Sequence, residues 1–264
     1  MTYEHYDMLK ISVDQRIMTI TMSRPAVKNA VNPALHDELS RIFADADRDT
    51  EVDVIILTGA GGAFSAGGDL DWLKALHGDP VATARSIQND RRIQNALLDL
   101  EKPILAKVNG PAIGLGCSLA LFCDFVYATP ESRFADPHVA VGLVAGDGGA
   151  VIWPQLIGYA RAKRYLLTGD AVLAPDAAQM GLITECVAAA EIDAVVQAMA
   201  QRLAAGATHA IKWTKSSINA GLKVTANAVI DRAAGLENLS MLMQDHGLAL
   251  EAMGRREKPK FVGR

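Results

Sequence analysis

Residues 52–70 read VDVIILTGAGGAFSAGGDL, and this stretch decides the fold. It begins with a continuous apolar run, Val52–Thr58, whose length suits a strand that is buried on both faces. A glycine-rich turn follows at 59–62, and Asp69 stands where it can cap a following helix. A buried strand, a glycine turn and a helix in this order are typical of parallel β-α-β units. The sequence therefore predicts an α/β protein.

The same cycle recurs further along the chain. Its predicted elements are a helix over 82–100, a strand over 103–108, a glycine-bearing loop over 109–116, an apolar helix over 117–123 and strands over 124–128 and 132–135. Residues 8–22 predict two short strands around a turn at Asp14-Gln15. Asn32-Pro33 has the residue types that start a helix. These elements extend the α/β pattern to the N-terminus.

Helical patterns dominate from about residue 175, apart from a predicted strand at 182–187. The chain is therefore expected to consist of a core that holds the site, residues 1–195, and a C-terminal helical region, residues 196–264. The basic tail, Arg255–Arg264, is expected to form a surface strand or a lid.

The amino-acid composition argues against several classes of function and of partner. Of the 264 residues, 26 are Lys or Arg and 30 are Asp or Glu, and the net charge of −4 argues against a nucleic-acid partner. The cysteines number three and include no C-x-x-C pair, so neither a disulfide framework nor a zinc site is expected, and a cytoplasmic location fits best. The N-terminus lacks the apolar core of a signal peptide, and no run approaches 18 apolar residues. We expect no membrane partner.

Two glycine-bearing loops are candidates for a binding site. Phe64–Leu70 and Asn109–Cys117 each follow a predicted buried strand and lead into a helix. On one edge of a parallel sheet, two such loops can aim two backbone N–H groups at one oxygen, which makes an oxyanion hole. The alternative is that each loop is a plain strand-to-helix turn. Neither has the spacing of a phosphate-binding loop.

At these residues the sequence resembles the crotonase, or enoyl-CoA hydratase/isomerase, superfamily. The segments that extend the resemblance are Phe134–Gly149, Tyr165–Asp170 and Ala177–Leu182. It implies a spiral of repeated β-β-α units with a C-terminal helical region that mediates trimerisation. It further implies an acyl-CoA thioester as substrate, no cofactor beyond the coenzyme A that the substrate carries, no metal, and a homotrimer or a hexamer formed from two trimers.

The resemblance also implies where the substrate lies. The backbone N–H groups of Gly68 and Leu115 would hold the carbonyl oxygen of the thioester. The residues expected near the coenzyme A nucleotide are Ala26, Lys28, Ala30, Ala66 and Asp69.

The catalytic positions depart from the usual pattern of the hydratases. Where hydratases have two glutamates, this sequence has Ser118 and His138. His138 can titrate near neutral pH, and Asp147 is expected to orient its ring. This pair resembles the β-diketone hydrolase branch, exemplified by 6-oxocamphor hydrolase. His36 and Glu237 also match that branch, which implies a catalytic role for Glu237 and a substrate-binding role for His36.

Each of these residues also has a purely structural interpretation. His138 can be a structural histidine, Asp147 a turn residue between glycines, and Glu237 one side of a helix salt bridge. His36 fits an exposed helix position better than a site. The remaining histidines, at 5, 77, 209 and 246, are expected on the surface, and Cys117 and Cys123 are expected to be core thiols.

The leading functional prediction is a lyase of the enoyl-CoA hydratase type, in which His138 and Asp147 replace the two glutamates. The alternatives are an isomerase, a hydrolase that cleaves a C–C bond of a 1,3-diketone, and a non-catalytic protein that binds CoA esters. The presence of an acid–base pair in the catalytic position argues against the last of these.

Overall fold

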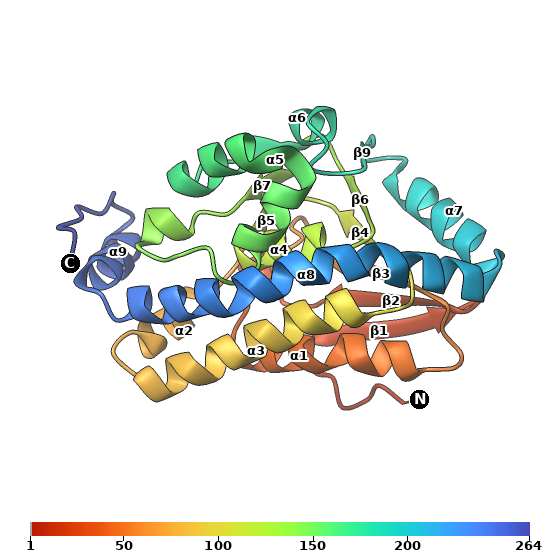
Figure 1. Ribbon diagram of the computed structural model, residues 1–264, viewed down its shortest axis with the longest axis horizontal. Coiled ribbons are helices and arrows are strands. Elements are labelled where there is room, and N and C mark those ends of the chain that lie inside the picture. Colours follow the sequence, from red (N-terminus) through yellow and green to blue (C-terminus); the bar gives the residue numbers. More distant parts are fainter. Residues whose placement is uncertain (1) are drawn as a thin grey trace.

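The computed structural model describes residues 2–264 and has one main sheet with helices on both faces (Figure 1). The strands of this sheet, in spatial order, are β1 (Leu9–Asp14), β2 (Ile17–Met22), β3 (Val54–Gly59), β4 (Ile104–Val108), β6 (Phe125–Ala128) and β9 (Glu185–Cys186). β1 and β2 form an antiparallel hairpin, and every later pair is parallel. This confirms the predicted α/β fold, although the predicted strand at 182–187 shrinks to two residues.

A second, three-stranded sheet begins within the second glycine loop. It consists of β5 (Ala112–Ile113), β7 (Arg133–Ala135) and β8 (Val172–Leu173), with β5 parallel and β8 antiparallel to β7. The end of β5 leads to Leu115, and the end of β7 leads to His138. The small sheet therefore brings two candidate site residues to one edge.

Most of the helices lie between strands in the order of the chain, and the last three follow the final strand. They are η1 (Pro25–Val27), α1 (Pro33–Arg48), α2 (Leu70–Leu76), α3 (Pro80–Asp99), α4 (Leu115–Leu121), η2 (His138–Val141), α5 (Gly149–Thr168), α6 (Ala174–Gln179), α7 (Ile192–Ala204), α8 (Thr208–Met241) and α9 (Gln244–Arg255). α1 starts as predicted, because the Asn32 side chain accepts a hydrogen bond from the Leu35 amide at 2.9 Å. Asp69 caps α2 in the same way, through the Asp71 amide.

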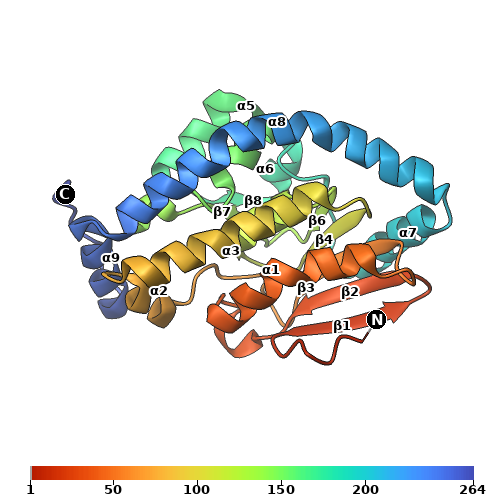
Figure 2. The same cartoon turned by 60° about the horizontal axis from the view of Figure 1, so that its bottom comes forward.

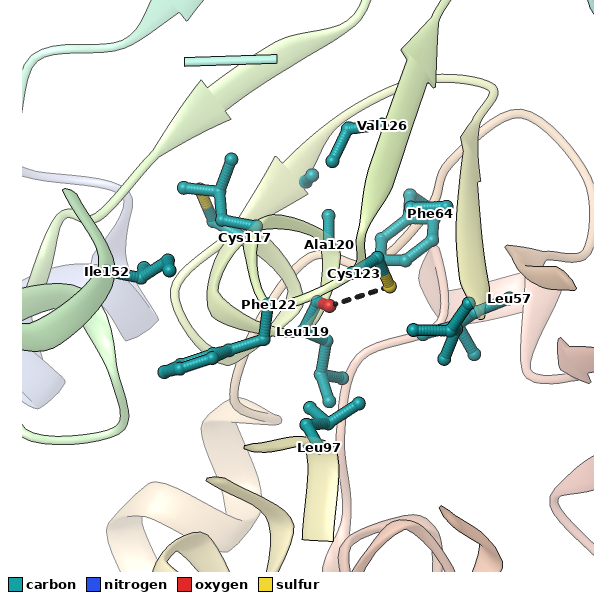
Figure 3. Packing of buried hydrophobic residues seen from close by; sticks show 14 of the residues in the cluster. Leu57, Phe64, Leu97, Cys117, Leu119, Ala120, Phe122, Cys123, Val126 and Ile152 are labelled. Atoms are coloured by element: carbon teal, nitrogen blue, oxygen red, sulfur yellow. Dashed lines mark hydrogen bonds between the residues drawn. The ribbon is translucent and has the colours of Figure 1, made fainter. Parts of the chain in front are cut away.

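Side chains of β3 alternate between two apolar layers. Ile55 and Leu57 belong to the larger core, which α1 and α3 cover, whereas Val54 and Ile56 face the layer that contains α7. Because both faces are buried, β3 reads as an uninterrupted apolar run rather than an alternating one. Figure 3 shows Leu57 in this packing, close to Phe64 and to α4.

The predicted core thiols are confirmed. Cys117 and Cys123 are buried, and the Cys123 thiol donates a hydrogen bond to the Leu119 carbonyl at 3.3 Å, as drawn in Figure 3. Burial raises the pKa of both thiols. Neither is therefore suited to act as a nucleophile.

The C-terminal region is built on α8, which runs alongside α3 and contacts α5 (Figures 1 and 2). None of the helices in residues 2–264 is long and apolar enough to cross a bilayer. Residues 256–264 contain no strand, which corrects the strand alternative for the tail. The tail instead returns to α9, where the Asp245 carboxylate accepts hydrogen bonds from the Val262 and Gly263 amides.

Candidate active site

The two predicted oxyanion-hole residues border one cavity of about 180 Å³. Gly68 lies between β3 and α2, and Leu115 is the first residue of α4. Within residues 2–264, the backbone N–H of neither residue has a hydrogen-bond acceptor. Two unpaired amides at the wall of one cavity are the arrangement that stabilises a developing oxyanion.

Gly67 allows the two loops to approach each other. Its φ of +81° lies in the region that favours glycine, and a Cβ there would be 2.9 Å from the Ile113 carbonyl oxygen. The loops are joined by a hydrogen bond from the Ile113 amide to the Ser65 carbonyl at 3.0 Å. The close approach of the two loops therefore requires glycine at position 67.

His138 projects into the same cavity from the end of β7, and carboxyl groups approach both of its ring nitrogens. Nδ1 is hydrogen-bonded to Asp136, whereas Nε2 lies 3.3 Å from Asp147 Oδ2 and 3.9 Å from Glu237 Oε1. Asp136, which the sequence analysis missed, thus holds the ring at Nδ1. Asp147 faces the other nitrogen, so it is not the only residue that orients the ring.

Asp147 and Glu237 reach the site from distant parts of the chain. Asp147 lies in the G-D-G loop before α5 and accepts a hydrogen bond from Ser118 Oγ at 3.0 Å. Glu237 comes from α8, is 3% exposed, and its Oε2 has no hydrogen-bond partner in the described chain. Ser118, at the position of a hydratase glutamate by resemblance, therefore supports Asp147.

Burial and charge set the protonation of this cluster. Burial lowers the pKa of His138, but the adjacent charges of Asp136 and Asp147 raise it by more, so the pKa lies well above its usual value. Burial tends to raise the pKa of Asp147, yet the imidazolium and the Ser118 hydrogen bond lower it overall. Burial raises the pKa of Glu237 well above its usual value. These opposing effects favour the imidazolium form of His138.

Asp136, His138 and Asp147 present possible metal-ligand atoms within 4.8 Å of one another. The two ring nitrogens of His138 face different carboxyl groups, however, and one is already hydrogen-bonded. This geometry favours a hydrogen-bonded imidazole at the site.

The residues expected near the coenzyme A nucleotide lie in two adjoining segments. The Ala66 amide donates to the Lys28 carbonyl at 2.9 Å, and the Lys28 side chain is exposed without an ion-pair partner in residues 2–264. Ala26 is exposed, Ala30 is buried, and both lie beside Lys28 in sequence. Asp69 pairs with Arg24 at 3.2 Å.

Two histidine predictions are wrong. His36 is 1% exposed rather than on the surface, and its Nε2 lies 2.7 Å from Asp90 Oδ1. Asp90 borders the cavity, whereas His36 does not. His246 is also buried, with its Nδ1 bonded to the Val141 carbonyl. Both pairings join elements that are distant in sequence, so no local pattern could reveal them.

Comparison with known proteins identifies the family of this chain. The model of the enoyl-CoA hydratase/isomerase family matches residues 12–263, so the chain belongs to this family of the crotonase superfamily. The chain is 31% identical to 2,3-dehydroadipyl-CoA hydratase of Escherichia coli, over 97% of this chain and 99% of that protein.

Solved structures with this fold include members with different activities. An enoyl-CoA hydratase/isomerase from Mycobacterium paratuberculosis is 36% identical with a TM-score of 0.91, over 94% of this chain and 99% of that one. A β-diketone hydrolase from Anabaena, bound to (S)-3-oxocyclohexyl acetic acid, is 27% identical with a TM-score of 0.84, over 89% and 94%.

Proposed function

We propose that the protein is a lyase of the enoyl-CoA hydratase type, which adds water to an α,β-unsaturated acyl-CoA. The observation that carries this proposal is one cavity bordered by Gly68, Leu115 and His138, where two unpaired amides meet an imidazole. Hydration needs a site that stabilises an enolate and a group that moves a proton beside it. No cofactor is required beyond the coenzyme A of the substrate.

The positions of Glu237 and His138 and the directions of their pKa shifts support the following proton transfers. Glu237 has a raised pKa, so its carboxylate is the stronger base toward water. The water oxygen bonds to the β-carbon, its proton passes to Glu237, and the electrons of the double bond move to the thioester oxygen between the two amides. The His138 imidazolium then gives its Nε2 proton to the α-carbon. Glu237 Oε1 is 3.9 Å from Nε2, so a small movement returns the proton and resets the site.

Lys28 supports the assignment of the substrate class. Its side chain is an exposed cation beside Ala66, where a phosphate of coenzyme A can bind it. Calorimetry with a saturated acyl-CoA should show binding that weakens in Lys28→Ala. Lys10→Ala, which removes an exposed lysine on the outer strand, should bind like the wild type. Equal binding by both variants would contradict this placement of the nucleotide.

The direct test is a panel of 2-enoyl-CoAs, with products followed by mass spectrometry and NMR. We expect a gain of one water and a new hydroxyl on the β-carbon. The pH profile should be bell-shaped: the rising limb reports ionisation of Glu237 above the usual range of glutamate, and the falling limb reports loss of the His138 proton above the usual range of histidine. Release of free coenzyme A or a shifted double bond would instead identify a thioesterase or an isomerase.

A second candidate is hydrolysis of a C–C bond in a 1,3-diketone. It is favoured by the histidine and aspartate at the catalytic positions and by the similarity to the Anabaena β-diketone hydrolase. Water would attack one carbonyl and the leaving enolate would occupy the oxyanion hole. Cyclic diketones in the same panel test this, because ring opening forms a carboxylate. If no member of the panel reacts, the non-catalytic alternative becomes the better explanation.

We also propose that the protein is a homotrimer or a dimer of trimers in the cytoplasm. Several large apolar side chains of α8 are more than half exposed in the single chain, among them Trp213, Ile218, Val224 and Leu239. Such exposure is typical of surfaces that bind another subunit. Sedimentation at micromolar concentration should give a trimer or a larger assembly, and a stable monomer would refute this.

A further inference from the structure

Two polar side chains of α3 face the cavity and exchange no proton in the proposed mechanism, although the charge of Asp90 adds to the burial that raises the pKa of Glu237. Ser86 is 6% exposed and Asp90 is 7% exposed, and both border the cavity that contains His138. The apolar residues that share this lining include Trp72, Leu73, Leu76, Val141, Leu143 and Met241. A second polar group among these apolar side chains, in addition to the cluster around His138, requires a reason.

The hydrogen-bonding capacity of the pair is only partly used. The Ser86 hydroxyl makes no hydrogen bond with any group of residues 2–264. One oxygen of Asp90 is bonded to His36 Nε2 at 2.7 Å, and the other has no partner in the same range. Neither of these two unpaired oxygens is fully buried, so both retain some access to solvent. An acyl chain that covers them without forming hydrogen bonds would leave them buried and unpaired, which is costly, whereas a ligand group that pairs with them avoids that cost.

The helix spacing allows one ligand group to reach both residues. Ser86 and Asp90 are four residues apart on α3, which places their Cβ atoms roughly 5–6 Å from each other on one face. The Asp90 carboxylate only accepts hydrogen bonds, whereas the Ser86 hydroxyl both donates and accepts. A hydroxyl group satisfies both residues. A carbonyl oxygen would face Asp90 without a hydrogen between them, and a methylene would leave both residues unpaired.

We propose that the acyl pocket selects an acyl group that carries a hydroxyl remote from the thioester, bound by Asp90 and Ser86. This inference rests on the proposed function, because it places the acyl chain in this cavity. His36 is a positioning residue here, since it holds Asp90 through a buried contact and does not itself border the cavity.

The experiment compares matched 2-enoyl-CoAs of increasing chain length, one series ending in a methyl group and the other in a hydroxymethyl group. The readout is the ratio of kcat/KM between the two members of each pair, which is insensitive to the fraction of folded enzyme. The wild type should prefer the hydroxylated member at the matching length by about 10- to 100-fold, as expected for a buried hydrogen bond to a charged group.

Variants of α3 separate recognition from folding. Asp90→Leu should abolish the preference, and Ser86→Ala, which removes a single hydroxyl, should reduce it severalfold. Asn89→Ala is the matched control, because Asn89 is adjacent on the same helix but bonds to Arg92 and does not border the cavity. It should keep the wild-type ratio. A preference that survives both Asp90→Leu and Ser86→Ala would overturn the inference.

Calorimetry with the corresponding saturated acyl-CoAs keeps this test independent of turnover. Tighter binding of the hydroxylated member without turnover of any enoyl-CoA would support the polar pocket and refute hydration alone. Turnover with equal kcat/KM for both series would refute the polar pocket alone. If no CoA ester binds, both proposals are wrong.

Discussion

Replacing Asp136 by asparagine tests the charge balance around His138 most directly. Asp136 is 1% exposed and bonds to Nδ1 of the ring, so its charge acts on the imidazolium at short range and with little screening. The asparagine side chain keeps the size and one acceptor oxygen but removes the charge. Because this charge raises the pKa of His138, its removal lowers that pKa and shifts the falling limb of the pH profile toward acid.

The size of the shift follows from the geometry. An opposite charge within about 4–6 Å moves a pKa by about 1–3 units, and one unit corresponds to about 1.4 kcal/mol. Asp147 still faces Nε2 at 3.3 Å in this variant, so part of the elevation should remain. We therefore expect the falling limb to move down by about 1–3 units while the pKa of His138 stays above that expected from burial alone.

The assay is kcat as a function of pH, together with the titration of His138 followed by NMR. Asp193→Asn provides the control, because Asp193 is an exposed carboxylate that pairs with Lys107 away from the cavity. It should leave both curves unchanged. A falling limb that is the same in Asp136→Asn and in the wild type would show that the charge of Asp136 does not set the protonation of the ring.

Three further outcomes follow from the site and the core. His138→Ala should reduce turnover by about 10²–10⁴-fold, and adding Asp147→Asn should reduce it little further, because the effects of substituting residues that act as a unit are not additive. If the two effects add fully in steady-state kinetics, the two residues act separately. Gly67→Ala should lower kcat by about 10²–10³-fold, because the added Cβ would meet the Ile113 carbonyl and displace the neighbouring Gly68 amide, while the circular dichroism spectrum stays native. An unchanged kcat would refute the tight approach to Ile113. Phe43→Ala should lower the free energy of unfolding, measured in urea, by about 3–5 kcal/mol because Phe43 is fully buried. A loss below about 1 kcal/mol would contradict its position in the core.

Local sequence patterns predicted most of the elements of the main sheet and the helices beside it, but not the short strands β5 and β8. The run Val52–Thr58 predicted β3 because a strand buried on both faces is apolar at every position. Asn32-Pro33 predicted the start of α1 because capping is a contact between near neighbours. The two glycine loops were expected to lie together because parallel strands end at a common edge, and Gly68 and Leu115 do border one cavity. The division of the chain at residue 195 stays a prediction.

The side-chain pairings of the site required the tertiary structure. Glu237 meets His138 only because α8 crosses the core, and His36 meets Asp90 only because α1 packs against α3. Asp136 is two residues from His138, yet a D-x-H spacing in a loop does not determine which ring nitrogen the carboxylate meets.

The pKa values of the site residues also could not be predicted from the sequence. Composition identifies ionisable residues, whereas their pKa values depend on burial and on charges that approach through space. The sequence of this protein therefore predicted the sheet and the two glycine loops, since these depend on local periodicity and on turn residues, and its motifs indicated the family by resemblance. The upward shift of the His138 pKa arises only in the folded chain, because it depends on how deeply the ring is buried and on its distances to the surrounding carboxyl groups.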